Sequence, residues 1–332
     1  MNSLGRLFRI SIYGESHGSQ LGVLIDGCPA GLAITEDDFV KDIMRRKSGA
    51  KGTTPRKEED SPILLSGVFN GYSTGAPIMI AFQNKNTRSS DYANLFTFPR
   101  PGHADFTGKM KYGGFNDYRG GGHFSGRLTL ALVAAGVVAK KIIKSVNIEA
   151  KLIEAGGQKN IDKAIDYAIE NNDSIGGIVE CRAENISVGL GEPFFDSVES
   201  VLSHAVFAIP AIKGIEFGVG FKAASMFGSQ HNDALIDISG KTHTNHAGGV
   251  NGGISNGNPL IFRVAVKPTS SIAKPQDTIN LKSGNTESLK IEGRHDACIA
   301  LRMPVVIEAV TAIVLTDFMM LEQKLDRIIP HD

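Results

Sequence analysis

Histidine and arginine residues beside glycines are the most chemically suggestive feature of the sequence. His17 stands in Gly14-Glu-Ser-His-Gly18, whose glycines would let a ligand approach the imidazole closely. His103 lies in Arg100-Pro-Gly-His-Ala-Asp105, a predicted turn that also carries a guanidinium group. Histidine exchanges protons near neutral pH, and arginine holds phosphates or carboxylates through paired bonds. These residue types predict acid–base chemistry on an anionic ligand. The plain alternative for His17 is a turn histidine bonded to nearby backbone, and for the second segment it is an Arg–Asp pair that stabilises the turn.

A glycine-rich segment leads directly into a predicted helix. Arg119-Gly-Gly-Gly-His-Phe-Ser-Gly-Arg127 places backbone N–H groups and cationic side chains at the start of a helix predicted for about 127–145. Helix N-termini attract anions. Because the glycines are consecutive, the segment matches neither the dinucleotide-binding pattern nor the Walker pattern. An anion-binding loop is favoured over a connector with solvated arginines.

The densest basic run spans 45–57 and has small residues between its charges. Nucleic-acid binding is one interpretation of such a run. However, it lacks aromatic side chains on which bases could stack, and Glu58-Glu59-Asp60 follows it directly. A basic loop over an anionic small molecule is favoured, with a solvated charge run as the plain alternative.

Three segments near the C-terminus carry further polar groups. Lys267-Pro-Thr-Ser-Ser271, downstream of Gly252, offers an ammonium and three hydroxyl groups that could hold a flavin phosphate or ring edge. Gly293-Arg-His-Asp296 places a guanidinium group beside a potential base. A strand-end turn and an exposed ion pair are the plain alternatives. His243-Thr-Asn-His246 has no third ligand, so no metal is assigned.

Composition narrows the class of protein. The 332 residues are 42% hydrophobic and 21% charged, which is typical of a globular protein with a substantial core. The 35 basic and 35 acidic residues cancel, so no global field would draw the chain onto nucleic acid or a membrane. Cys28, Cys181 and Cys298 form no paired motif, which favours a reducing cytosol.

The elements that must position these groups are both helical and extended. Apolar periodicity and capping residues predict helices at 36–47, 127–145, 161–171, 197–208 and 304–325, the last a buried helix rather than a membrane span. Apolar runs between glycine and proline turns predict strands at 7–13, 22–26, 63–69, 78–83, 178–182 and 260–267. No linker divides the chain, so one domain over 1–332 is expected. A G-x-x-x-G-x-P pattern at 71–77 and again at 253–259 suggests a duplication.

The order of the motifs is more specific than any one of them. GESHG, RRKSGAKGTTPRKEED, RPGHADFTGKMKYGG, DYRGGGHFSGR, HAGGVNGGIS, KPTSSIAKPQ and GRHDACI follow one another along the chain. In this order the sequence resembles the chorismate synthase family, from about residue 4 to 325. The resemblance implies an α+β fold, specifically a single-domain β-α-β sandwich, usually assembled as a homotetramer.

The resemblance also implies an activity. Reduced FMN and 5-enolpyruvylshikimate-3-phosphate would share a basic pocket, where a 1,4-elimination without net redox change gives chorismate and phosphate. His17 resembles the acid near the departing phosphate, His103 the histidine that controls protonation of reduced flavin, and Asp296 the base working through flavin N5. The expected binding residues for substrate are Arg46, Lys51, Arg100, Arg127 and Arg294, and those for flavin are His123, Phe124, Ser125, Pro210, Ala211, Gly252, Lys267, Pro268, Thr269, Ser270, Ser271 and Arg294.

The sequence departs from the family pattern at three of these loop positions. His123-Phe124 replaces a common Arg-Ser pair, and Leu128 replaces a common Glu. The alternatives are a basic anion- or nucleic-acid-binding protein without catalysis, and a flavin reductase or phosphatase that uses the same pocket. No nucleophile-plus-metal phosphatase motif is present in the sequence, and an NADPH-dependent flavin reductase activity stays open.

Overall fold

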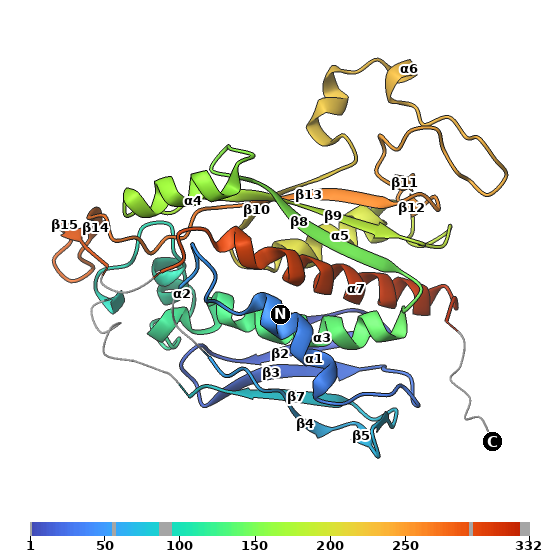
Figure 1. The fold of residues 1–332 in the computed structure, drawn as a ribbon. Helices are drawn as coiled ribbons and strands as arrows, with labels where there is room; N and C mark the ends of the chain where they lie inside the picture. Colours follow the sequence, from blue (N-terminus) through green and yellow to red (C-terminus); the bar gives the residue numbers. More distant parts are fainter. Residues whose placement is uncertain (1, 55–57, 86–94, 292–294, 326–332) are drawn as a thin grey trace.

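The chain folds as two antiparallel sheets with helices between them (Figure 1). The computed structural model describes residues 2–54, 58–85, 95–291 and 295–325. The α+β class and the β-α-β sandwich expected from the resemblance are confirmed. Apolar side chains of both sheets and of the enclosed helices form one continuous buried cluster.

The first sheet has the strand order β1-β2-β3-β7-β4. Its strands are β1 (Ser3–Leu4), β2 (Arg9–Gly14), β3 (Gln20–Asp26), β4 (Ile63–Ser66) and β7 (Ile78–Gln83). Leu21, Val23 and Ile25 alternate along β3 and are fully buried, because one face of the sheet is covered by helices. These helices are α1 (Asp37–Arg46) and α3 (Thr129–Ile142), which also contact each other.

The second sheet has the order β10-β13-β9-β8. Its strands are β8 (Asn147–Ala155), β9 (Gly177–Glu184), β10 (Ile212–Phe217) and β13 (Leu260–Val266). Every second residue of β13 is buried, from Leu260 to Val266. The helices α5 (Val198–Phe207) and α7 (Met303–Leu321) contact this sheet, and α4 (Ile161–Glu170) contacts β8.

The long apolar helix α7 lies at the centre of the molecule, against α3 and β8. Ile299–Leu321 is long and apolar enough to cross a membrane, yet 78% of its most apolar window is buried inside the fold. Its two acidic side chains have fixed partners. Glu308 accepts two bonds of 2.6 Å from Arg45, and Asp317 accepts backbone N–H groups of residues 6–8. The prediction of a buried helix is confirmed.

The two sheets share one topology, which supports the suggested duplication. The order β2-β3-β7-β4 in the first sheet corresponds to β8-β9-β13-β10 in the second. Each repeated glycine pattern forms a short hairpin before the central strand: β5 (Val68–Phe69) with β6 (Tyr72–Ser73), and β11 (Val250–Asn251) with β12 (Ile254–Ser255). Both two-residue turns have positive φ at both positions, as a type I′ turn requires.

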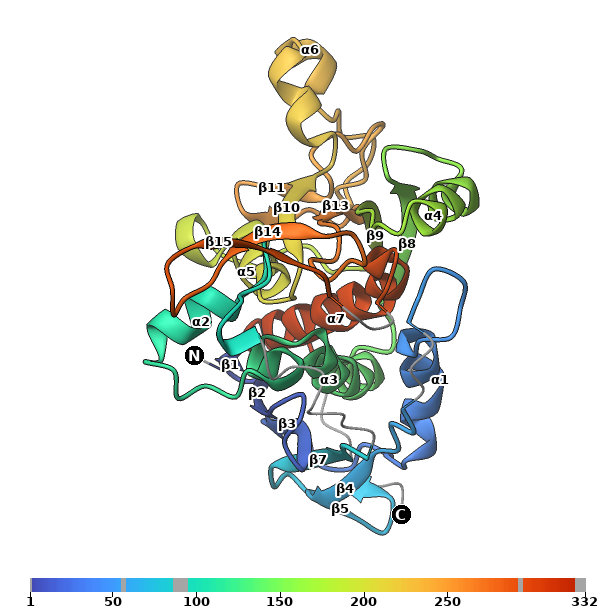
Figure 2. The same ribbon diagram turned by 90° about the vertical axis from the view of Figure 1, so that its left-hand side faces the viewer.

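Most of the expected elements are present within a few residues of their predicted bounds. The expected strand at 63–69 is divided into β4 and β5. Among the elements that were not predicted are α2 (Asp105–Lys111), β8, β10, β14 (Gln276–Ile279) and β15 (Thr286–Leu289). In Figure 2 the end of the sandwich that carries α2, β14 and β15 faces the viewer.

Candidate functional site

A cavity of about 1510 Å³ opens where several loops meet at the ends of the helices. Its lining comes from the turn after β2, the end of α1, the segments before α2, α3 and α7, and the loops around β10 and β13. Among the described lining residues are seven Lys or Arg and three Asp or Glu. The cavity therefore favours anionic ligands, although the chain as a whole is neutral.

His17 and the glycine-rich loop form one wall of this cavity. His17 is only 6% exposed, and its ring lies against Gly120. The loop forms a 3-10 segment, Arg119–Phe124, in which Gly120, Gly121 and Gly122 have φ values of 59°, 84° and 54°. Such values favour glycine, and a Cβ at Gly120 would lie 2.5 Å from Cδ2 of His17. The glycines thus let the backbone of this loop pass close to the imidazole, a contact that the sequence analysis did not predict.

We expect Gly120→Ala to lower turnover about 100-fold, because a shift of about 1 Å in a reacting group can cost that much. The matched control is Gly157→Ala. Gly157 also has a positive φ, of 76°, but no atom lies within 4 Å of where its Cβ would stand. Both variants place a Cβ on a residue with positive φ, and only the first brings this Cβ against His17. Equal turnover in the two variants, measured beside thermal unfolding, would show that the contact with His17 has no role.

Arg100 and His103 lie on the opposite side of the glycine-rich loop and share a carboxylate. Asp105 accepts bonds from Nε and Nη2 of Arg100 at 2.7 and 2.8 Å, and its Oδ1 lies 2.7 Å from Nδ1 of His103. Nη1 of Arg100 also donates to the hydroxyl of Ser271. Burial raises the pKa of Asp105, but hydrogen bonds from Arg100 and His103 outweigh this effect and hold that pKa well below its ordinary value. The Arg–Asp pair of the plain alternative forms, and His103 lines the cavity, as its predicted role would require.

Arg46 and Arg127 are buried together near the start of α3. Arg46 donates to Thr129 and to the carbonyl oxygens of residues 126 and 127. Asp60 lies 2.6 Å from Nη1 of Arg127 and 3.7 Å from Nη1 of Arg46. Burial, Arg302 and Arg127 lower the pKa of Arg46, and Asp60 opposes this. A guanidinium group nevertheless stays protonated in proteins, so the cluster presents concentrated positive charge to the cavity.

Asp296 lies at the cavity wall before α7. Its Oδ1 accepts the backbone N–H of Thr54 at 2.9 Å, and Nη1 of Arg302 lies 3.3 Å from its Oδ2. The neighbouring Arg294 lies outside the described residues, so its predicted contacts with substrate and flavin stay predictions.

The expected flavin-binding residues mostly line the same cavity. They are His123, Phe124, Ser125, Pro210, Ala211 and the run from Lys267 to Ser271. Nζ of Lys267 donates to the carbonyl of Gly102, which joins this run to the loop that carries His103. The residues that depart from the family pattern are also held in place: His123 Nδ1 lies 2.8 Å from the carbonyl oxygen of Gly14, and the Phe124 ring packs against Gly108.

Two expected residues are not among those that line the cavity. Lys51 is exposed and pairs with Asp166 of α4. Gly252 is in the turn between β11 and β12, with no atom within 4 Å of where its Cβ would stand. The structure does not bring these two residues to the other predicted site residues.

Two buried polar atoms make the cavity suitable for an anionic cofactor and substrate. Oγ1 of Thr269 and Nη2 of Arg127 have no hydrogen-bond partner among the described residues, and Nη2 has only a longer ion pair, of 4.0 Å, with Glu58. Unsatisfied buried donors are costly, so each predicts a ligand atom within reach. A hydroxyl and a guanidinium group in a cavity that Lys267 also lines fit the phosphate groups of FMN and of a phosphorylated substrate.

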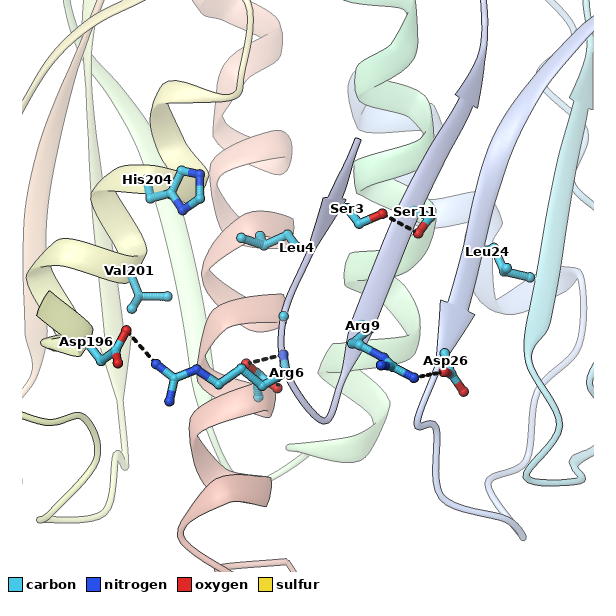
Figure 3. A pocket seen from close by; sticks show the side chains of 12 residues that line it. Ser3, Leu4, Arg6, Arg9, Ser11, Leu24, Asp26, Asp196, Val201 and His204 are labelled. Atoms are coloured by element: carbon cyan, nitrogen blue, oxygen red, sulfur yellow. Dashed lines mark hydrogen bonds and ion pairs between the residues drawn. The ribbon is translucent and has the colours of Figure 1, made fainter. Parts of the chain in front are cut away.

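A second cavity, of about 520 Å³, lies between β1 and α5 (Figure 3). Its two arginines are paired, Arg6 with Asp196 and Arg9 with Asp26. His204 also lines it. Its lining holds two arginines and three aspartates, so it lacks the excess of basic groups that makes the larger cavity favour anions.

Several residues of the larger site were missed by the sequence analysis. Asp60 pairs with Arg46 and Arg127, and Arg302 pairs with Asp296 and donates to the Arg46 carbonyl. Asn84 accepts from Nε of Arg127. The acidic run that ends at Asp60 was a usable signal for a counter-ion beside the basic run.

Comparisons with known proteins agree with this geometry. A profile of the family described as "Chorismate synthase" matches residues 8–320. The chain is 64% identical to a protein named chorismate synthase from Chitinophaga pinensis, over 99% of both chains. It is 50% identical to one from Dehalococcoides mccartyi, over 95% of this chain and 96% of the other. A solved structure titled "Crystal Structure of Chorismate Synthase" has a TM-score of 0.75 at 28% identity, over 98% of this chain and 95% of that one. The chain belongs to the chorismate synthase family.

Proposed function

We propose that this protein is a chorismate synthase, a lyase that eliminates phosphate from 5-enolpyruvylshikimate-3-phosphate in the presence of reduced FMN. The observation that carries the proposal is the cavity in which two histidines, an aspartate and buried arginines converge. Family membership supports the same activity.

The residues divide into anion-binding and proton-exchanging groups. Arg46, Arg100 and Arg127 bind the phosphate and carboxylate groups of the substrate, since guanidinium groups make paired, charge-assisted bonds. His123, Ser125 and the run from Lys267 to Ser271 would hold reduced FMN, which would supply transient electron donation and assist removal of the substrate hydrogen. His17 gives a proton to the departing phosphate, and Asp296 accepts a proton at a carboxylate oxygen. The buried walls of the cavity exclude water while the phosphate leaves.

An anaerobic turnover assay tests the proposal. With reduced FMN and the ester, the protein should form chorismate, whereas oxidised FMN or no flavin should give none. Phosphate release from unrelated monoesters without flavin would instead support the phosphatase alternative.

We expect reduced FMN to bind more tightly than oxidised FMN, and more tightly still when substrate is present. The reason is that the cofactor and the substrate would complete one charged site, and such coupling is typically about 5-fold or more. Anaerobic titration followed by flavin absorbance measures each affinity. Equal affinity in both redox states, with and without substrate, would refute the coupling.

We also propose that residues 1–332 form one catalytic domain that works as a cytoplasmic homotetramer. The continuous core across both sheets supports one domain, and three buried free cysteines suit a reducing compartment. The segment around α6 (Gly228–His231) extends away from the sheets (Figure 1). It exposes Phe221, Phe227 and Leu235, which contact between subunits would bury. That there are four subunits is inferred from the family resemblance alone.

A further inference from the structure

The carboxylate of Asp105 stands behind the cavity rather than in it. Asp105 is not among the lining residues, but its two partners, Arg100 and His103, both are. Its side chain is 4% exposed, and it accepts three bonds from Arg100, including one from the backbone N–H. Asp105 therefore contacts no ligand directly, yet it connects to two groups that would.

The contact with His103 determines which ring nitrogen carries the proton. An ionised carboxylate can only accept a hydrogen bond, so Nδ1 of His103, 2.7 Å from Oδ1, must be the donor. Nε2 is then the unprotonated nitrogen of the neutral ring, and the donor group Nη2 of Arg100 lies 3.2 Å from it and 3.0 Å from Nδ1. Gly121 lies beside Nε2, and a Cβ at this position would stand 3.4 Å from that nitrogen.

The charged groups around His103 come from three segments. Arg100 and Asp105 belong to its own segment and to the start of α2. Lys267, from the loop after β13, bonds to the carbonyl of Gly102. From the glycine-rich loop, Gly121 lies beside the ring. Asp105 is thus the anion placed to stabilise the protonated imidazole among these cations.

We propose that Asp105 is a positioning residue that holds His103 in its Nδ1–H form and fixes Arg100 beside it, so that Nε2 is the ring nitrogen that takes up a proton. The catalytic consequence rests on the proposed chorismate synthase function, whereas the protonation state of the ring does not.

Asp105→Asn tests the catalytic part. Loss of the negative charge makes protonated His103 less stable, so the limb of the pH–turnover profile that reports this histidine moves to lower pH, by about 1 to 3 units. Turnover at neutral pH falls, and Asp105→Glu recovers part of it. In a His103→Gln background, Asp105→Asn should leave the pH profile unchanged.

Asp317→Asn is the matched control. Asp317 is also a buried carboxylate that accepts backbone N–H groups, but it lies outside the larger cavity. This variant should lower the thermal unfolding temperature without moving the pH profile. If Asp105→Asn behaves in the same way, Asp105 is only structural and the proposal is overturned.

Nitrogen-15 spectra of histidine-labelled wild-type protein test the ring directly. The His103 signal, assigned by its loss in His103→Gln, should show a protonated Nδ1 in the neutral ring, and an Nε2–H form would overturn the proposal. Because the ring is observed in the wild-type protein, the result does not depend on whether an Asp105 variant folds. A protonated Nδ1 in a protein that makes no chorismate would support the positioning and refute the proposed function.

Discussion

Asp296→Asn should lower the rate of the chemical step by about 100-fold or more and leave reduced-FMN binding largely intact. The amide keeps the size of the side chain and can still accept the Thr54 N–H, but it cannot take up a proton at neutral pH. Rapid-quench kinetics under anaerobic conditions, beside thermal unfolding, measure the loss. A structural role for Asp296, as the partner of Arg302, predicts unfolding instead.

Asp173→Asn is the control for this variant. Asp173 likewise accepts one backbone N–H, from Ser174, and pairs with a cation, Lys274, but it does not line the cavity. It should keep its chemical rate. A normal rate in Asp296→Asn, or a lost rate accompanied by unfolding, would contradict the assignment of Asp296 as a base.

Arg127→Lys should lower kcat/KM by about 10- to 150-fold, the range expected for one hydrogen bond to a charged group. Lysine keeps the positive charge near Asp60, but its compact ammonium cannot bond Asn84 and Asp60 and also present the Nη2 donor. Steady-state kinetics with varied substrate measure the effect.

Arg119→Lys provides the comparison within the same loop. Arg119 pairs with Asp117 through Nε and Nη2 and is absent from the cavity lining. A small effect there and a large one at position 127 would locate the anion at Arg127. Equal effects would mean that both arginines only stabilise the loop.

The sequence predicted the long helices and the central strands because their apolar residues repeat strongly. It did not predict β8, whose residues, Asn-Ile-Glu-Ala-Lys-Leu-Ile-Glu-Ala, include strong helix formers. They form a strand because the segment pairs along its length with β9, and such tertiary pairing overrides local preference. The short helix α2 contains Gly108, which is needed because the Phe124 ring lies 2.8 Å from where a Cβ would stand.

The site was predictable where chemistry and backbone geometry occur in one short segment. His17 and the glycine-rich loop are examples, although their contact joins residues about one hundred positions apart. The ion pairs of Asp60 and Arg302 connect segments that are distant in sequence, and nothing local shows which partners they select. Asp105 was visible as the partner of Arg100, but its bond to His103 depends on the geometry of the turn.

The most direct test of the account is one anaerobic single turnover in which product and flavin are followed together. With enzyme in excess of the ester and saturating reduced FMN, the account predicts equal amounts of chorismate and phosphate. The flavin should be fully reduced at the end, because the elimination has no net redox change. Phosphate release without chorismate, or oxidation of one flavin for each phosphate released, would contradict the account.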